Sequence, residues 1–267
     1  MNEIIYKLIG LVGGVFGLLI YVSGAQAATI SVGPVNDVVQ YDYHTIQEAV
    51  DIATGQDLIY VTAGEYNENV VIPKNSEIRI TGEIGDPSSV VLHGNITFQD
   101  SASNTAAVLE DFTIKADGLQ YAIQSSQNIS LRDMRIRGGN DGVIMKAGNI
   151  DINNSFIRRA QHHGLVLQKA AGSLWVYTST FKKNKAAGIR IDGNFYGRIT
   201  NSNFLSNRKG LTLKDAELLN AGSDYGLKDC VLRHNFIGVL LINSTMNRSH
   251  NTFENNTKDI VTVSAVN

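Results

Sequence analysis

Four basic side chains in the second half of the chain have types and positions that suit chemistry on an acidic substrate: Lys146, His162, His163 and Arg190. Cleavage of an acidic sugar by β-elimination requires positive charge to neutralise the substrate carboxylate and a base to remove the proton at C5. Lys, Arg and His can serve in these roles. We take the four as candidate catalytic residues, against the alternative that they are solvated turn and surface side chains.

Six further residues are candidates for substrate binding. Two of them precede the His pair in the same turn, and three occupy outward positions of neighbouring repeats. The sixth is an aromatic residue on another strand, where its ring could stack on a sugar. The set is Arg158, Arg159, Gln168, Asp192, Lys214 and Trp175.

A repeated phrase must position these side chains. Glycine followed by alternating apolar residues recurs at steps of 22, 24, 22 and 28 residues, at Gly142, Gly164, Gly188, Gly210 and Gly238. A period in this range indicates a solenoid, in which each coil buries its apolar face against its neighbours. The first and third residues after each glycine should point inward, which leaves an exposed column of Ile144, Val166, Arg190, Thr212 and Leu240.

Polar residues recur at a second fixed place in each repeat: Asp111, Asp133, Asn154, Thr178, Asn201, Asp229 and His250. Short alternating strands stacked about 4.8 Å apart would align them as a ladder of turn residues. Asn and Asp suit such turns because they tolerate left-handed backbone and bond nearby amides. A second group precedes the next coil: Asn184, Asn207, Asn235 and Asn256. We expect both ladders to be structural.

One segment before the repeats favours a helix. In His44–Thr54 the apolar residues recur at helical spacing, and Thr45 with Glu48 makes a capping box. A solenoid needs its first coil covered, because open strand edges invite aggregation. The helix is the natural cap.

The phrase TIQEAVDIATGQDLIYVTAGEYNENVVIPKNSEIRITG resembles the opening of the pectin-lyase-like superfamily of right-handed parallel β-helix proteins. The later repeats resemble the parallel β-helix repeats of carbohydrate-binding and sugar-hydrolase proteins. The resemblance implies an all-β, right-handed parallel β-helix of about 20–28-residue coils with an N-terminal cap helix. It implies no single activity, since this fold hosts lyases, hydrolases, esterases, epimerases, adhesins and non-catalytic members.

The active-site motifs of individual superfamily enzymes match this sequence less well than the repeats do. No motif of the pectin methylesterases follows Gly94, and the D-P-H-D phrase of the uronate epimerases is absent. The order of Asp141-Gly142, His163-Gly164 and Arg190 is similar to the polygalacturonase pattern, but the D-D pair of that pattern is missing. A calcium site stays open, although no local motif supports it.

The first residues have the features of a secretory leader. An apolar run, Leu8–Val22, precedes Ala25-Gln-Ala27, which predicts a signal peptide at 1–27 and a secreted or periplasmic protein. An uncleaved membrane anchor is the alternative. We expect the cap helix and first coils at 28–100, and the repeats at 101–267.

The amino-acid composition limits which kinds of partner and cofactor we expect. A formal net charge of −2 over 267 residues gives no global attraction to nucleic acid or membranes. The single cysteine, Cys230, excludes an internal disulfide, and no Cys/His spacing typical of a metal site occurs. We expect a monomer with no membrane span in the mature chain and no identified cofactor.

Three functions remain open. The first is an enzyme that acts on an acidic polysaccharide, as a lyase or a related modifying enzyme. The second is a non-catalytic carbohydrate-binding or surface protein. The third is a periplasmic accessory protein for the maturation of metalloenzymes.

Overall fold

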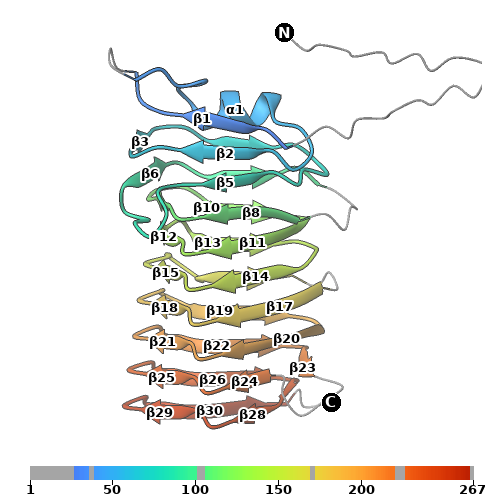
Figure 1. Ribbon diagram of the computed structural model, residues 1–267. Helices are drawn as coiled ribbons and strands as arrows, with labels where there is room; N and C mark the ends of the chain where they lie inside the picture. Colours follow the sequence, from blue (N-terminus) through green and yellow to red (C-terminus); the bar gives the residue numbers. More distant parts are fainter. Residues whose placement is uncertain (1–26, 36–38, 101–105, 169–171, 220–225, 265–267) are drawn as a thin grey trace, which may run out of the picture.

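The computed structural model describes residues 27–35, 39–100, 106–168, 172–219 and 226–264, which wind into a single stack of coils (Figure 1). Each coil contributes strands to three parallel sheets, which we number in chain order. The first sheet contains β1 (Thr29–Val32), β2 (Leu58–Val61), β5 (Arg79–Thr81), β8 (Ala106–Glu110), β11 (Asn128–Arg132), β14 (Ile150–Asn153), β17 (Gly172–Tyr177), β20 (Phe195–Thr200), β23 (Glu217–Leu219), β24 (Gly226–Lys228), β27 (Thr245–Met246) and β28 (Arg248–Ser249).

The second and third sheets have nine strands each. The second contains β3 (Gly64–Tyr66), β6 (Val90–His93), β9 (Thr113–Ala116), β12 (Arg135–Gly138), β15 (Phe156–Arg158), β18 (Thr180–Lys182), β21 (Asn203–Leu205), β25 (Val231–Arg233) and β29 (Thr252–Glu254). The third contains β4 (Val70–Ile72), β7 (Ile96–Phe98), β10 (Tyr121–Ser125), β13 (Asp141–Met145), β16 (Leu165–Leu167), β19 (Ala187–Asp192), β22 (Lys209–Lys214), β26 (Ile237–Ile242) and β30 (Lys258–Val263). The predicted all-β, parallel β-helix architecture is confirmed.

The repeated glycines stack as direct neighbours in the third sheet. Val143, Leu165 and Ile189, each following its glycine, pair in register across three successive strands. A Cβ atom on Gly164 would lie 2.6 Å from the carbonyl oxygen of Gly188. Glycine is therefore required because the backbones approach too closely for any side chain.

Both polar ladders form as predicted. All seven turn residues that follow the first-sheet strands adopt positive φ, from 45° at Asn154 to 57° at Asp111. In the second ladder, Nδ2 of Asn207 donates to Oδ1 of Asn235 at 3.3 Å, and Nδ2 of Asn235 donates to Oδ1 of Asn256 at 3.0 Å. These amides satisfy buried polar groups that the coils would otherwise leave unpaired.

Alternation of side chains fills one continuous apolar interior, in which Phe181 and Phe204 stack with ring centroids 5.4 Å apart. The expectation of a wholly exposed outward column in the third sheet is wrong. Val166, Thr212 and Leu240 are only 8%, 5% and 7% exposed. Val166 lies in register beside Arg190, and Thr212 lies between Arg190 and Leu240, so longer neighbours shield the shorter side chains.

Helix α1 (Ile46–Ile52) is shorter than the predicted segment and begins with the predicted capping box of Thr45 and Glu48. It lies at the N-terminal end of the stack beside β1, and Ile46, Ala49 and Val50 are buried against the core (Figure 1). Its protection of the first coil from unwanted strand pairing stays a prediction. In the described part of the chain no helix has the length and apolarity to cross a membrane. The predicted leader at 1–27 lies almost entirely outside the described residues.

Candidate functional site

The turn between β15 and β16 places His163 at the edge of the third sheet. Its backbone N–H donates to Oδ1 of Asp141 at 3.0 Å, and the backbone N–H of Ala187 donates to Nδ1 of its ring at 3.2 Å. Because Nδ1 accepts a hydrogen bond, the neutral ring carries its proton on Nε2. His163 is thus fixed by the coils on both sides.

Burial lowers the pKa of His163 from 6.5 to about 4, with further lowering by Arg190, His162 and Lys209 and an opposing effect of Asp141. The ring is therefore uncharged at neutral pH. An uncharged imidazole with Nε2–H exposed to a substrate would donate a hydrogen bond to it. The neighbouring His162 is exposed, with its ring centroid 6.4 Å from that of His163.

Arg190 is neutralised on its own strand. Its Nε lies 3.1 Å from both carboxylate oxygens of Asp192, and its Nη2 lies 3.0 Å from Oδ2. The Arg190 side chain is 34% exposed, so it can still contact a ligand, although Asp192 competes for it. A substrate carboxylate would have to share or replace this partner.

Lys209 is a residue that the sequence reasoning missed. It follows Ala187 in register at the start of β22, in the same column as Asp141 and His163. Burial, and then Arg208 and Arg190, lower the pKa of Lys209 below its ordinary value. A lysine with a lowered pKa is a better proton acceptor at neutral pH than an ordinary one.

The remaining third-sheet candidates lie further along the same strands. Lys146, Gln168 and Lys214 are exposed, and Lys214 pairs in register with Asp192. The backbone N–H of Gln168 donates to the carbonyl of Met145 at 2.9 Å, which places Gln168 beside Lys146 in the next coil. The structure therefore groups Lys146 with Gln168, Asp192 and Lys214, and it groups His163 with Asp141 and Lys209.

Basic side chains form a column on the outer face of the second sheet. Five of them follow one another in register on successive coils: His93, Lys115, Arg137, Arg158 and Lys182. We call these five the basic ladder. Burial and the neighbouring arginines lower the pKa of Arg158, whose guanidinium carbon lies 5.2 Å from the ring centroid of Phe156.

Two ladder members have acidic partners, since Arg137 pairs with Asp117 at 3.3 Å and His93 lies 3.2 Å from Glu65. The turns that lead from the ladder to the third sheet add Arg159 and Lys183, both exposed and at positive φ. The candidate Arg158 thus belongs to a larger basic surface. The signal was present in the sequence, because each ladder member directly follows the large apolar residue of its repeat.

A hollow adjoins the N-terminal end of the basic ladder. It has a volume of about 370 Å³, and His93, Lys115, Asp117 and Glu68 are among the residues that line it. The Glu68 carboxylate accepts hydrogen bonds from the backbone of Ile46 and Gln47 at the start of α1. This acid is therefore committed to the helix, and His93 and Lys115 are the basic residues among those that line the hollow.

Trp175 lies on a different face from the other candidates. It is part of β17 in the first sheet, where it pairs in register with Asp151 on one side and Arg198 on the other. The structure therefore does not bring Trp175 together with His163 or Arg190.

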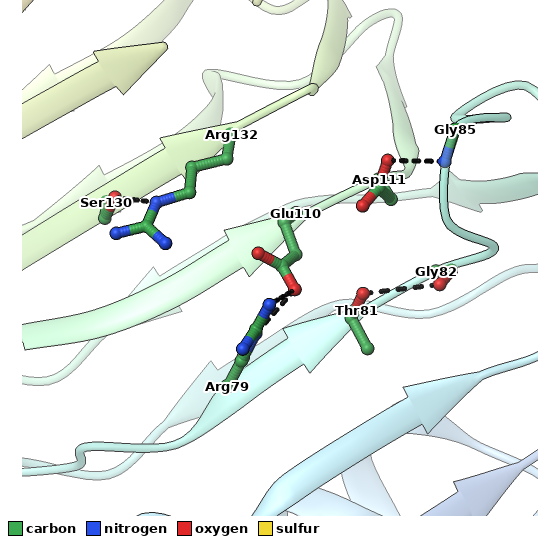
Figure 2. Close-up of polar contacts among 8 residues, drawn as sticks. All are labelled: Arg79, Thr81, Gly82, Gly85, Glu110, Asp111, Ser130 and Arg132. Atoms are coloured by element: carbon green, nitrogen blue, oxygen red, sulfur yellow. Dashed lines mark hydrogen bonds and ion pairs between the residues drawn. The ribbon is translucent and has the colours of Figure 1, made fainter.

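The first sheet also carries a group of polar contacts nearer the N-terminus, which Figure 2 shows. Glu110, with a side chain only 7% exposed, accepts from Nε and Nη2 of Arg79. Arg132 lies beside Glu110 in register and donates from Nε to Oγ of Ser130 at 3.2 Å. Asp111 accepts from the backbone N–H of Gly85 at 3.1 Å. Each of these polar groups has a hydrogen-bond partner within the fold, so a structural role is enough to explain their presence.

Among the described residues no three His, Cys, Asp or Glu side chains gather as a metal site would require. Cys230 is buried, and burial raises the pKa of its thiol to about 12.

Several solved structures of other proteins are similar to this chain. Among solved structures, Escherichia coli YbhC is similar, with 12% identity, a TM-score of 0.51, and coverage of 87% of this chain and 85% of that chain. The catalytic domain of GH87 alpha-1,3-glucanase in complex with nigerose matches at 11% identity and a TM-score of 0.43, covering 82% and 54%. The A-module of the Azotobacter vinelandii mannuronan C-5 epimerase AlgE4 matches at 11% identity and a TM-score of 0.34, covering 83% and 94%.

At sequence identities this low, the similarity concerns the fold alone. No curated protein sequence matches the chain. A family model described as the right handed beta helix region matches residues 117–266. Because this match spans more than half of the chain, the protein belongs to the right-handed β-helix family.

Proposed function

We propose that this protein binds an acidic polysaccharide along the basic ladder and the turns that lead from it to the third sheet. The observation that supports this proposal is the in-register column His93, Lys115, Arg137, Arg158 and Lys182. Strands in a parallel stack lie about 4.8 Å apart, so the column repeats positive charge at short, regular intervals from Lys115 to Lys182. A linear polysaccharide with a carboxylate on each sugar presents a matching row of negative charge.

Ion pairing accounts for Arg137 but not for Lys115, Arg158 and Lys182, for which the described residues supply no acidic partner. Like charges directly opposite each other on neighbouring strands are destabilising. The partial burial that lowers the pKa of Arg158 adds a further cost to the charged state. A polyanion laid along the column would offset these costs, because it supplies negative charge beside Lys115, Arg158 and Lys182.

The adjacent turns widen the basic surface toward the third sheet. Arg159, Lys183 and Arg208 are exposed there, and Lys209 is half-buried behind them. A bound chain would therefore contact two rows of cations. Export, which the leader at 1–27 predicts, would place the protein where polysaccharides occur.

A lyase is the second candidate, and the lowered pKa of Lys209 favours it. In such a reaction the neutral amine would take the C5 proton, and the C5–H electron pair would form the C4–C5 double bond as the C4–O bond breaks. The leaving oxygen would take a proton from water. Arg190 would neutralise the uronate carboxylate, and the Nε2–H of His163 would donate to it.

Binding and catalysis are separable by experiment. The double variant Arg158→Gln/Lys182→Gln removes two ladder charges, and Lys74→Gln/Lys258→Gln removes two exposed charges elsewhere. At about 1 kcal/mol for each basic residue against a polyanionic surface, the ladder variant should weaken binding roughly thirtyfold. Binding should also be strongly salt-dependent in the wild type, and less so in the ladder variant.

The measurement is calorimetric titration with polygalacturonate, alginate and glycosaminoglycan fragments. Equal affinities of the two double variants would remove the ladder from the proposal. Absorbance of the unsaturated product, followed with the same polymers and with Lys209→Gln as a comparison, tests the lyase candidate. If no polymer yields that product, the binding function stands alone.

A further inference from the structure

The first sheet presents a second constellation, separate from the basic ladder. Trp175 lies in the middle of a column, with Asp151 beside it on β14 and Arg198 beside it on β20. All three side chains are partly exposed. At the strand spacing of about 4.8 Å, a carboxylate and a guanidinium therefore flank the indole on its two sides.

The two charged groups have unused hydrogen-bonding capacity. Within the described residues neither the Asp151 carboxylate nor the Arg198 guanidinium has a hydrogen-bond partner, and Nε of Arg198 is shielded from water. Burial raises the pKa of Asp151, despite the opposing charge of Arg132. Partly buried polar groups without partners cost stability, so the arrangement differs from the satisfied Arg79–Glu110 pair on the same sheet.

A second aromatic ring extends the surface. Tyr196 stands two residues before Arg198, on the same face of β20, and is 68% exposed. It therefore lies diagonally across from Trp175, within reach of an aromatic side chain. The Trp175 and Tyr196 rings therefore lie on the same face of the first sheet as the Asp151 carboxylate and the Arg198 guanidinium.

We propose that Asp151, Trp175, Tyr196 and Arg198 form a binding site for a neutral sugar ring. A pyranose has an apolar C–H face and a rim of hydroxyl groups. The face would stack on the indole, the hydroxyls would donate to Asp151, and Arg198 would donate to a hydroxyl oxygen.

The charge of Asp151 decides between neutral and acidic sugars. A uronate carboxylate beside Asp151 would meet like charge, whereas a hydroxyl gives it the donor that it lacks. The site therefore complements the basic ladder, which is on another sheet and would take the acidic parts of a polymer. The inference goes beyond the proposed function and does not depend on it.

A single tryptophan makes the site directly observable. Trp175 is the only tryptophan of the chain, so intrinsic fluorescence reports on this site alone. The probes are oligosaccharides of glucose, galactose, mannose and xylose, with oligogalacturonate as the acidic comparison. At least one neutral oligosaccharide should change the emission saturably, and calorimetry should give a matching affinity.

Variants test the roles of the individual side chains. Trp175→Ala and Asp151→Asn should each weaken binding of the neutral ligand by about tenfold or more. Phe236→Ala removes an exposed aromatic side chain in the turn before β26 and should change nothing. The ladder variant Arg158→Gln/Lys182→Gln should also bind the neutral ligand as the wild type does. That result distinguishes this site from the proposed polyanion surface.

Three outcomes would overturn the inference. The first is the absence of a saturable emission change with any neutral oligosaccharide at millimolar concentration. The second is a response to oligogalacturonate alone. The third is wild-type affinity in Trp175→Ala and Asp151→Asn proteins whose circular dichroism shows an intact fold.

Discussion

The buried asparagine ladder should dominate the stability of the C-terminal coils. Asn207 is 3% exposed and uses its whole amide: Oδ1 accepts from the backbone N–H of Asn184 at 2.9 Å and from Nδ2 of Asn184 at 3.1 Å. Its Nδ2 donates to the carbonyl of Phe181 at 2.9 Å and to Asn235 at 3.3 Å. Asn207→Ala would remove these side-chain partners from the backbone N–H of Asn184 and the carbonyl of Phe181. The side-chain amides of Asn184 and Asn235 would each lose one bond and keep another, to the carbonyl of Ile157 and from the backbone N–H of residue 207.

The size of the effect follows from those contacts. Each buried polar group left without a partner costs about 1–3 kcal/mol. Two backbone groups and two side-chain groups lose a bond, and some will relax toward other partners. We therefore expect Asn207→Ala to lower the free energy of unfolding by about 3–6 kcal/mol.

A matched control exists in the same ladder. Asn256 makes the same kind of bonds, with Nδ2 donating to the carbonyl of Leu232 at 2.8 Å, but it lies near the C-terminal end and is partly exposed. Water can replace its bonds, so Asn256→Ala should cost about 1 kcal/mol. Urea unfolding, followed by circular dichroism and by Trp175 fluorescence, measures both values. Equal losses in the two variants would refute the reasoning that burial sets the cost.

The remaining predictions concern close packing, protonation and charge. Gly164→Ala should destabilise the fold by about 2 kcal/mol, since its Cβ would lie 2.6 Å from the Gly188 carbonyl oxygen, and urea unfolding should show this loss. The pKa of His163 is lowered to about 4, so its neutral form stabilises the fold above pH 6.5. That contribution should be lost as the pH falls from 6.5 to 4, and His163→Gln should flatten the pH dependence of the melting temperature in this window. The ladder variant Arg158→Gln/Lys182→Gln should unfold at an equal or higher urea concentration than the wild type, because it removes like-charge repulsion; a large loss of stability would mean that the ladder is structural.

The coil architecture could be predicted from the sequence because each coil repeats the same local signals. Asp111 and its equivalents mark the left-handed turns, and glycine marks the contact between neighbouring third-sheet strands. Thr45 and Glu48 mark the start of α1. Each of these features depends on a few neighbouring residues, so a single sequence suffices to find it.

Surface properties were harder to predict, because they depend on register between coils. The basic ladder joins residues about 22–24 positions apart, as from Lys115 to Arg137 and from Arg158 to Lys182, and only alignment of the repeats on their large apolar residues reveals it. The burial of Thr212 depends on the lengths of Arg190 and Leu240 beside it, which alternation alone does not describe. Trp175 was correctly taken as outward, but the sheet to which it belongs separates it from the other candidates.

The same stacking of coils produces the asparagine ladder and the basic ladder. Their effects on stability differ, and this difference distinguishes a structural ladder from a functional one. In a parallel stack, equal positions of successive coils must lie side by side. Asparagines placed there satisfy one another, as from Asn184 to Asn256, and each rung stabilises the next. Arginines and lysines placed there repel one another, and among the described residues Lys115, Arg158 and Lys182 have no acidic partner that offsets this cost. A sequence that keeps Lys115, Arg137, Arg158 and Lys182 in one column despite that cost departs from the local consistency seen in the rest of its coils, and such departures are expected where a protein meets its ligand. The missing counter-charge is the physical reason to look for a polyanion on the second sheet.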